Sequence, residues 1–367
     1  MKLLRIKPLK PFFFGGDINL GKYYYAKSEY FPQNTQLVGA LRFFIANQKG
    51  LMKGHKNGIY VPKDKRDKAA EIIGDAKPED FFENDNLGKI NFVSPMFVLK
   101  DNNAYFPTPL DLKSLKIKNF RNADDEHKKY IKNYSKYYFN YRYLTYKLKK
   151  LSNTYYLEGF DYKNIVYQKL GGRKFWEKYI NNEEILTNDM FEFSDVFKEV
   201  GQVGIELDNK MTVNEKFYSK ISYELAQGFE FGVLLDFDGE IKDGFIQIGA
   251  DGSMFELKVE ELNEELKTHP IIKAMIIPQK EGKKFVALSE VIEKEPINSV
   301  FRITPVYKTL RLNINKISKN EKIFRKTKEK NVACRGSVFY VDELPEFNLG
   351  AYKKMGYNLF IPIKETR

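Results

Sequence analysis

Short apolar runs separated by turn residues recur along most of the chain and predict a β-rich protein. In the first run, over residues 2–14, Leu4 and Ile6 alternate with basic residues. A polar stretch over residues 209–220 is predicted to be a loop between two strands. Further strands are predicted near residues 90–99, 203–208, 229–237, 245–257, 271–277, 285–288, 301–306 and 336–341.

One amphipathic helix is predicted near the start of the chain, because apolar residues between Leu37 and Ile45 fall on one helical face. Asn34 or Thr35 is a suitable N-cap, since a short polar side chain there can accept a hydrogen bond from a free backbone N–H. Arg42 follows closely, and helix starts favour phosphate. The helix start is therefore a candidate anion site.

Residues 113–200 are predicted to form a helical insertion. Tyrosine and leucine positions from Tyr130 to Leu151 step alternately by four and three residues, a heptad pattern sustained for three repeats. Twelve of the 24 tyrosines fall between residues 130 and 179, among lysines and arginines. Aromatic rings and cations together suit RNA. A packed helix interface explains the heptad pattern better, however, and leaves the lysine-rich outer face for a partner.

The net charge of +12 is unevenly distributed along the chain. Residues 111–180 hold 17 Lys and Arg against 7 Asp and Glu, and residues 301–335 hold 11 against 2. Residues 183–265 have the opposite balance, with 6 against 21. Separate blocks of opposite sign predict one face for a polyanion and another for a differently charged partner.

Motifs for common enzymatic chemistry are absent from the sequence. The three histidines, His55, His127 and His269, stand in no catalytic or metal-binding motif, and there is no Walker A loop or nucleophile elbow. The single cysteine, Cys334, leaves no internal disulfide, which favours a cytoplasmic protein. We therefore expect no catalytic residue, metal or cofactor. No apolar run approaches the length of a membrane span.

A glycine loop near the end of the chain is a second candidate anion site. Gly350 and Gly356 bracket a segment that includes Lys353 and Lys354, with strand-like runs on both sides. Glycine lets a backbone come close to a ligand, because it accepts positive φ and has no Cβ. By its own residues the loop is more simply explained as a turn.

Several short motifs occur in a characteristic order outside residues 113–195. They are Pro8-Leu9 with Phe13-Phe14, Pro32 with Gly39-Ala40-Leu41-Arg42, Phe106-Pro107 with Pro109-Leu110-Asp111-Leu112, Val203-Gly204-Ile205, Thr212 before Phe217-Tyr218, Ile248-Gly249, Gly336-Ser337-Val338-Phe339-Tyr340, and Gly350 with Gly356-Tyr357. This order resembles the RAMP superfamily of CRISPR RNA-binding proteins, and within it the subunit 3 family of type III-B (Cmr) effector complexes. The turn after Ile248 lacks the arginine that relatives often carry, and Asn358 stands where a third glycine is typical.

The resemblance implies an α+β protein with two ferredoxin-like (RRM-like) RAMP domains, residues 1–112 and 201–367, around the helical insertion at 113–200. It implies a non-catalytic subunit that grips the 5′ repeat-derived handle of the guide RNA and joins the palm-domain large subunit to a backbone RAMP subunit. Two alternatives stay open. One is a repeat-RNA-processing endoribonuclease using Tyr23 to Tyr25 or His55, and the other is an interaction scaffold without RNA contact.

The residues expected to contact RNA lie at the start of the first helix, in the 209–220 segment and in the glycine loop. They are Asn34, Thr35, Arg42, Lys210, Met211, Thr212, Lys216, Gly350, Lys353, Lys354 and Gly356.

Overall fold

The structure is a computed structural model. It describes residues 1–15, 18–19, 24–55, 58–115, 142–145, 147–151, 154–158, 166–208, 211–278, 281–294, 297–305, 308–310, 312–317, 322–328, 330–341 and 343–363.

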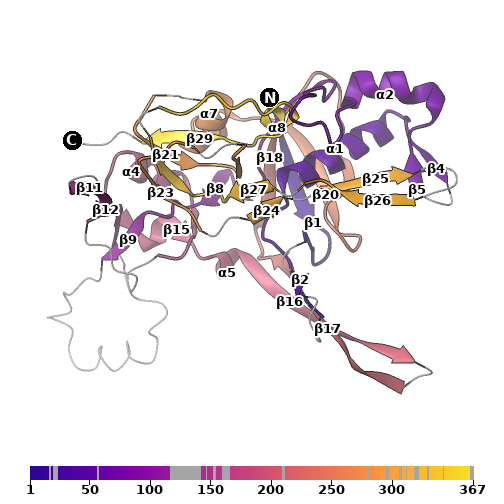
Figure 1. The fold of residues 1–367 in the computed structure, drawn as a ribbon, viewed down its shortest axis with the longest axis horizontal. Coiled ribbons are helices and arrows are strands. Elements are labelled where there is room, and N and C mark those ends of the chain that lie inside the picture. Colours follow the sequence, from indigo (N-terminus) through magenta and orange to yellow (C-terminus); the bar gives the residue numbers. More distant parts are fainter. Residues whose placement is uncertain are drawn as a thin grey trace.

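A large antiparallel sheet lies at the centre of the molecule (Figure 1). Its strands, in spatial order, are β15 (Met190–Phe191), β13 (Leu170–Gly171), β8 (Asn103–Pro107), β7 (Phe97–Lys100), β18 (Phe229–Phe237), β1 (Lys2–Pro8), β20 (Met254–Glu261) and β19 (Gly244–Gln247), and β6 (Ile90–Val93) also pairs with β18. The β-rich α+β class predicted from the sequence is confirmed.

The central sheet joins segments that lie far apart in the sequence. Strand β1 pairs antiparallel with β18 on one side and with β20 on the other. Leu3 and Leu4 point to opposite faces and both are buried, so β1 needs a cover on each face. The sheet therefore crosses the domain boundaries that the sequence suggested at residues 112 and 201.

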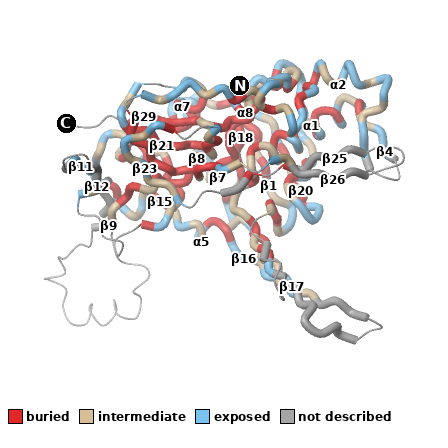
Figure 2. The backbone as a smooth tube through the Cα atoms, in the orientation of Figure 1, coloured by how far each residue is buried: buried red, intermediate tan, exposed pale blue. Residues whose placement is uncertain are grey.

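Each face of the sheet packs against its own core, and the buried residues concentrate in the middle of the molecule (Figure 2). On one face, the helix α1 (Asn34–Gln48) buries Leu37, Leu41 and Ile45, as the sequence periodicity predicts. The opposite face is covered by α4 (Arg173–Ile180), α7 (Pro270–Ile276) and a second sheet. The predicted helix thus forms, and the glycine loop and the sheet lie against it.

The remaining strands form smaller sheets and hairpins. They are the second sheet β23-β28-β21-β29 (Phe301–Ile303, Val338–Tyr340, Lys284–Ala287, Phe360–Ile363); β22-β27-β24 (Val291–Ile292, Lys330–Ala333, Lys308–Leu310); β14-β10-β9 (Ile185–Leu186, Arg142–Thr145, Leu112–Leu115); β11-β12 (Leu148–Leu151, Thr154–Leu157); β25-β26 (Asn313–Ile317, Lys322–Lys326); β4-β5 (Lys53–His55, Gly58–Tyr60); and β16-β17-β3-β2 (Phe197–Asp208, Met211–Leu225, Tyr24–Lys27, Ile18–Asn19). Within the described residues, the other α-helices are α2 (Arg66–Ile73), α5 (Phe193–Val196), α6 (Glu264–Lys267) and α8 (Ala351–Lys354).

The prediction of a helical insertion over residues 113–200 is wrong for most of its described part. The end of the tyrosine–leucine heptad pattern lies in two strands, β10 and β11, and the rest of that pattern falls outside the described residues. Strand β10 pairs with β9, so a partner strand distant in sequence overrides the local periodicity. Of this segment, α4 and the short α5 are helical.

The polar segment 209–220 is mostly strand and not the loop that its composition predicts. Strands β16 and β17 pair along nearly their whole length and form a long hairpin that projects from the body (Figure 1). The base of the hairpin is anchored in the body, where Phe197 and Tyr223 are buried.

Residues 271–277, predicted as strand, instead form most of α7. His269 is its N-cap, with Nδ1 accepting a hydrogen bond from the backbone N–H of Ile271 at 3.2 Å, and Pro270 occupies the first helical position. Burial lowers the pKa of His269 to about 3, so its imidazole is neutral and can act as this acceptor. The local capping signal outweighs the β-branched composition.

Candidate nucleic-acid interface

The two glycines of the closing loop are held by the protein's own backbone. Gly350 precedes α8 with φ of 52°, and Gly356 follows it with φ of 73°. A Cβ at Gly350 would lie closer than 3.0 Å to the carbonyl oxygen of Phe81, and one at Gly356 equally close to that of Val93. Glycine is therefore required at both positions for packing, whatever the loop binds.

Asn34 joins the start of α1 to the glycine loop across 321 residues of sequence. Its side-chain N–H group donates to the carbonyl of Met355 at 2.8 Å and to that of Gly356 at 3.2 Å. The side chain is 1% exposed, and Gln33 takes the N-cap position instead. Asn34 thus positions the loop against the helix and does not offer its amide to a ligand.

Arg335, which no sequence motif singles out, completes this junction. Its guanidinium donates to the carbonyl of Met96 at 2.7 Å and to Oδ1 of Asn34 at 3.2 Å, and it lies 5.1 Å from the ring centre of Phe31. Burial lowers the pKa of the Arg335 guanidinium. No local pattern could have identified this role, because its partners come from the first hundred residues.

Thr35 lies beside the other end of the loop. The hydroxyl of Tyr357 accepts a hydrogen bond from the backbone N–H of Thr35 at 3.4 Å. Tyr357 is 1% exposed whereas Thr35 is half-buried, so Thr35 lies at the edge of the junction. The structure therefore brings together two of the three predicted RNA-contacting segments.

Arg42 does not face a ligand, which corrects the sequence-based expectation. Its guanidinium donates to the carbonyls of Ile73, Gly74 and Ala76 at 2.7, 2.8 and 3.0 Å, where helix α2 ends. Burial lowers the pKa of Arg42, partly offset by the nearby carboxylate of Asp75. Carbonyls at a helix C-terminus need donors and favour cations, and Arg42 supplies both.

Replacing Arg42 with Met is expected to lower the free energy of unfolding by about 2 kcal/mol, because three carbonyls lose a charged donor. Urea denaturation measures this difference. Arg66→Met is the matched control, since Arg66 is an exposed arginine of α2, and it should cost less than about 0.5 kcal/mol. Equal costs for the two variants would contradict the capping role.

The two loop lysines differ in their surroundings. Lys353 is exposed, and it forms no ion pair with the part of the chain that the structure describes. Lys354 is half-buried, with its ammonium 3.6 Å from a carboxylate oxygen of Asp85. Lys353 is therefore the freer of the two to meet an anion.

The third predicted segment is only partly described. Lys210 lies outside the described residues, and Met211, Thr212 and Lys216 lie on β17 with side chains outside them. At the base of the same strand, Lys220 forms an ion pair with Asp251, and its ammonium lies 4.8 Å from the ring centre of Phe13. The turn after Ile248 thus receives from β17 the basic group that its own sequence lacks.

Features of other functions are sparse in the described residues. These contain no group of three or more His, Cys, Asp or Glu side chains placed to hold a metal, and none of their helices has the length and apolar character needed to cross a bilayer.

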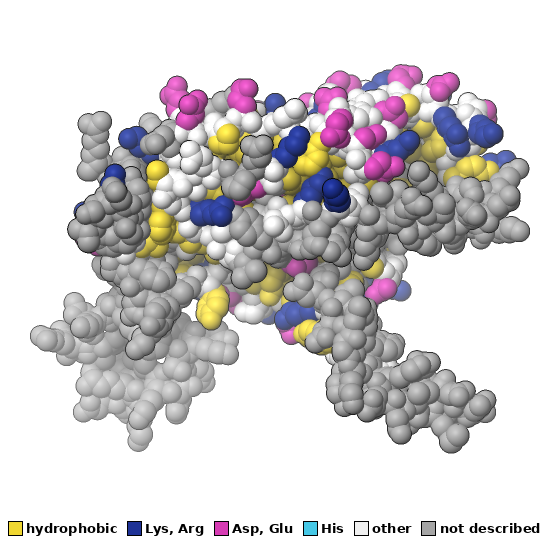
Figure 3. All heavy atoms as spheres, viewed as in Figure 1, with side chains coloured by type: hydrophobic (Ala, Val, Ile, Leu, Met, Phe, Trp, Pro, Cys, Tyr) yellow, Lys and Arg dark blue, Asp and Glu magenta, His cyan; other side chains and the backbone are white. Residues whose placement is uncertain are grey.

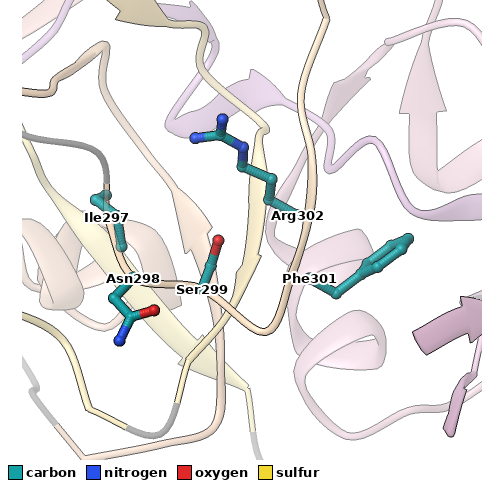
Figure 4. A pocket seen from close by; sticks show the side chains of 5 residues that line it. All are labelled: Ile297, Asn298, Ser299, Phe301 and Arg302. Atoms are coloured by element: carbon teal, nitrogen blue, oxygen red, sulfur yellow. The ribbon is translucent and has the colours of Figure 1, made fainter. Parts of the chain in front are cut away.

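A surface hollow of 390 Å³ is lined by Ile297, Asn298, Ser299, Phe301 and Arg302 (Figure 4). Its one charged group, Arg302, lies 3.3 Å from Glu293. Of the residues suggested for RNA cleavage, Tyr25 is 40% exposed on β3, and Tyr23 and the side chain of His55 lie outside the described residues.

Charges of both signs share the face seen in Figure 3. Lysine and arginine side chains lie near its centre, and acidic side chains gather along its upper edge over α2. Acidic residues near the basic loop, such as Asp85, would limit how far a polyanion can extend in that direction.

A protein family and several solved structures are similar to this chain. The sequence model of the CRISPR-associated protein family Cas_Cmr3 matches residues 4–364. A chain from a type III-B Cmr-beta structure with cognate target RNA and AMPPnP superposes with a TM-score of 0.52 at 12% identity, covering 98% of this chain and 96% of that one. A chain from the Cmr-beta structure with cognate target RNA has the same score and identity, with 99% and 97% covered. No curated protein sequence gives a significant match.

Proposed function

The chain belongs to the CRISPR-associated Cas_Cmr3 family, and from this membership we propose that it is a non-catalytic RNA-binding subunit of a type III-B effector complex. It grips the 5′ repeat-derived handle of the guide RNA. It also joins the palm-domain large subunit to a backbone RAMP subunit, in the cytoplasm.

One observation carries the RNA-binding part of the proposal. The glycine loop is fastened to the start of α1 by Asn34, and the exposed Lys353 stands next to that junction. The handle is single-stranded, and proteins recognise single-stranded RNA with backbone groups, cations and aromatic rings. A rigid loop that presents lysine beside a helix start supplies the cation.

The partners and domains follow from the same proposal. The acid-rich block over residues 183–265 suits contact with a protein partner, while the basic segments meet RNA. We assign the two ferredoxin-like units of the family to the central sheet with α1 and α8 and to the sheet β23-β28-β21-β29 with α7.

The double variant Lys353→Glu and Lys354→Glu tests the proposal. We expect weaker binding of single-stranded handle RNA and a slope of log affinity against log salt that is less steep by about 1.4, since each lost phosphate contact removes about 0.7. A filter-binding titration at several salt concentrations measures both. Lys242→Glu with Lys267→Glu is the control, because these exposed lysines already pair with Glu240 and Glu264. Affinity equal to that of the control would remove the loop from the RNA-binding surface.

A further inference from the structure

Two lysines outside the glycine loop lie close to one aromatic ring, and this ring also packs against the loop. The ammonium of Lys330 lies 3.7 Å from the ring centre of Phe82, and that of Lys294 lies 5.6 Å from the same centre. Strands β22 and β27 pair at Ile292 and Val332, which carries the two lysines to the same end of this strand pair. The arrangement is therefore set by strand register and not by chance contact of long side chains.

The shared ring belongs to the surroundings of the glycine loop. Phe82 packs against Tyr352 of α8 with 5.0 Å between ring centres. The carbonyl of Phe82 occupies the space that a Cβ at Gly350 would need. Lys330 also donates to the hydroxyl of Tyr352 at 3.4 Å. The lysine pair is thus attached to the same α8 that carries Lys353 and Lys354.

The two ammonium groups lack the partner that usually neutralises such a pair. Neither Lys294 nor Lys330 forms an ion pair within 4.0 Å in the described part of the chain. The pKa of Lys330 is lowered, mainly by burial. The charge of Glu83 partly offsets this shift, and the charge of Lys294 adds to it. Two cations near one ring repel each other, and a ring face compensates only part of this cost. An anion placed between them would remove the repulsion.

We propose that Lys294 and Lys330, presented on Phe82, form a phosphate-binding position for RNA that continues the surface of the glycine loop. The inference rests on the proposed function, because RNA is the polyanion that the loop would hold. RNA also suits the basic block over residues 301–335, of which Lys330 is a member.

The variant Lys294→Met with Lys330→Met, in the full chain, tests this position. Methionine keeps the apolar stems against Phe82 while removing both charges. We expect affinity for single-stranded handle RNA to fall on the order of tenfold at moderate salt and the salt slope to fall by about 1.4. Lys242→Met with Lys267→Met makes the same charge change at exposed, already paired lysines and should leave both values unchanged.

The single variant Lys294→Met separates a loss of RNA binding from a failure to fold. Lys294 is exposed, so Lys294→Met alone should keep the thermal unfolding midpoint and lower the salt slope by about 0.7. Normal RNA binding by both lysine variants, with weak binding by the Lys353→Glu and Lys354→Glu double variant, would overturn this inference and leave the proposed function intact. Normal binding by all three would overturn both. Loss of protein-partner capture with normal RNA binding would assign the lysine pair to an acidic protein and also overturn the inference.

Discussion

Replacing Lys284 with Met should lower the free energy of unfolding by about 3–5 kcal/mol, because it leaves a buried carboxylate without its cation. The ammonium of Lys284 lies 2.5 Å from Oδ2 of Asp111, and the two side chains are 5% and 0% exposed. The hydroxyl of Tyr179 donates to Oδ1 of the same carboxylate at 2.9 Å. Burial first, and the Asp111 charge second, raise the pKa of Tyr179 well above its ordinary value, so the phenol keeps the proton it donates.

This buried cluster connects three parts of the fold. Lys284 lies on β21 of the second sheet, Tyr179 on α4, and Asp111 just before β9. A loss of pairing at this point should therefore loosen the second sheet from the central one. We expect the variant to unfold at a lower urea midpoint.

The double variant Asp111→Asn with Lys284→Met separates charge from packing. Removing both charges should recover at least about half of the loss, since the cost of an isolated buried charge disappears. Lys267→Met, at an exposed position, is the control for general effects of the substitution and should change stability by less than about 0.5 kcal/mol. If Lys284→Met costs under about 1 kcal/mol, the pair does not hold the sheets together.

The sequence predicts elements well where local periodicity and tertiary packing agree. Helix α1 forms because the face from Leu37 to Ile45 matches the apolar face of the central sheet. Its first residue illustrates the limit. A short polar residue such as Asn34 is typical of an N-cap, yet its side chain donates a hydrogen bond to the carbonyl of Met355 instead. A contact at that sequence distance leaves no local signal.

The two most visible errors have the same physical origin. The heptad pattern ending at Leu151 predicts a helix, but β11 finds a partner strand in β12. Arg42 is predicted to contact RNA near a helix start that favours phosphate, but it lies in the middle of α1, and the carbonyls at the end of α2 accept hydrogen bonds from its guanidinium. In both cases a competing partner, not a wrong propensity, decides the outcome.

The glycine loop is a partial success of the same reasoning. Glycine pairs predict positive φ and close approach, and both Gly350 and Gly356 have positive φ. What approaches them is the protein's own backbone, from Phe81 and Val93. The RNA-binding role of the loop therefore depends on its lysines and stays a proposal.

The variant Gly356→Ala should destabilise the protein by about 3 kcal/mol for two separable reasons. Alanine at a φ of 73° costs about 1–2 kcal/mol, and its Cβ would press on the carbonyl oxygen of Val93, a fully buried residue of β6. Gly252→Ala is the matched control. Its φ is 67°, but a Cβ there would have no heavy atom within 4 Å, so only the backbone cost applies.

The difference between these two variants measures the close approach itself, and we expect it to be about 1–2 kcal/mol in urea denaturation. A loop that only turned the chain would give two equal losses. Amide hydrogen exchange then locates the effect, because moving Gly356 pulls its carbonyl away from Asn34 and loosens the start of α1. If the loop also cradles RNA, Gly356→Ala should weaken handle-RNA binding at temperatures where the protein is still folded, whereas Gly252→Ala should not. Stability lost without any loss of RNA affinity would mean that the loop fastens α1 in place and that its lysines bind RNA without help from its shape.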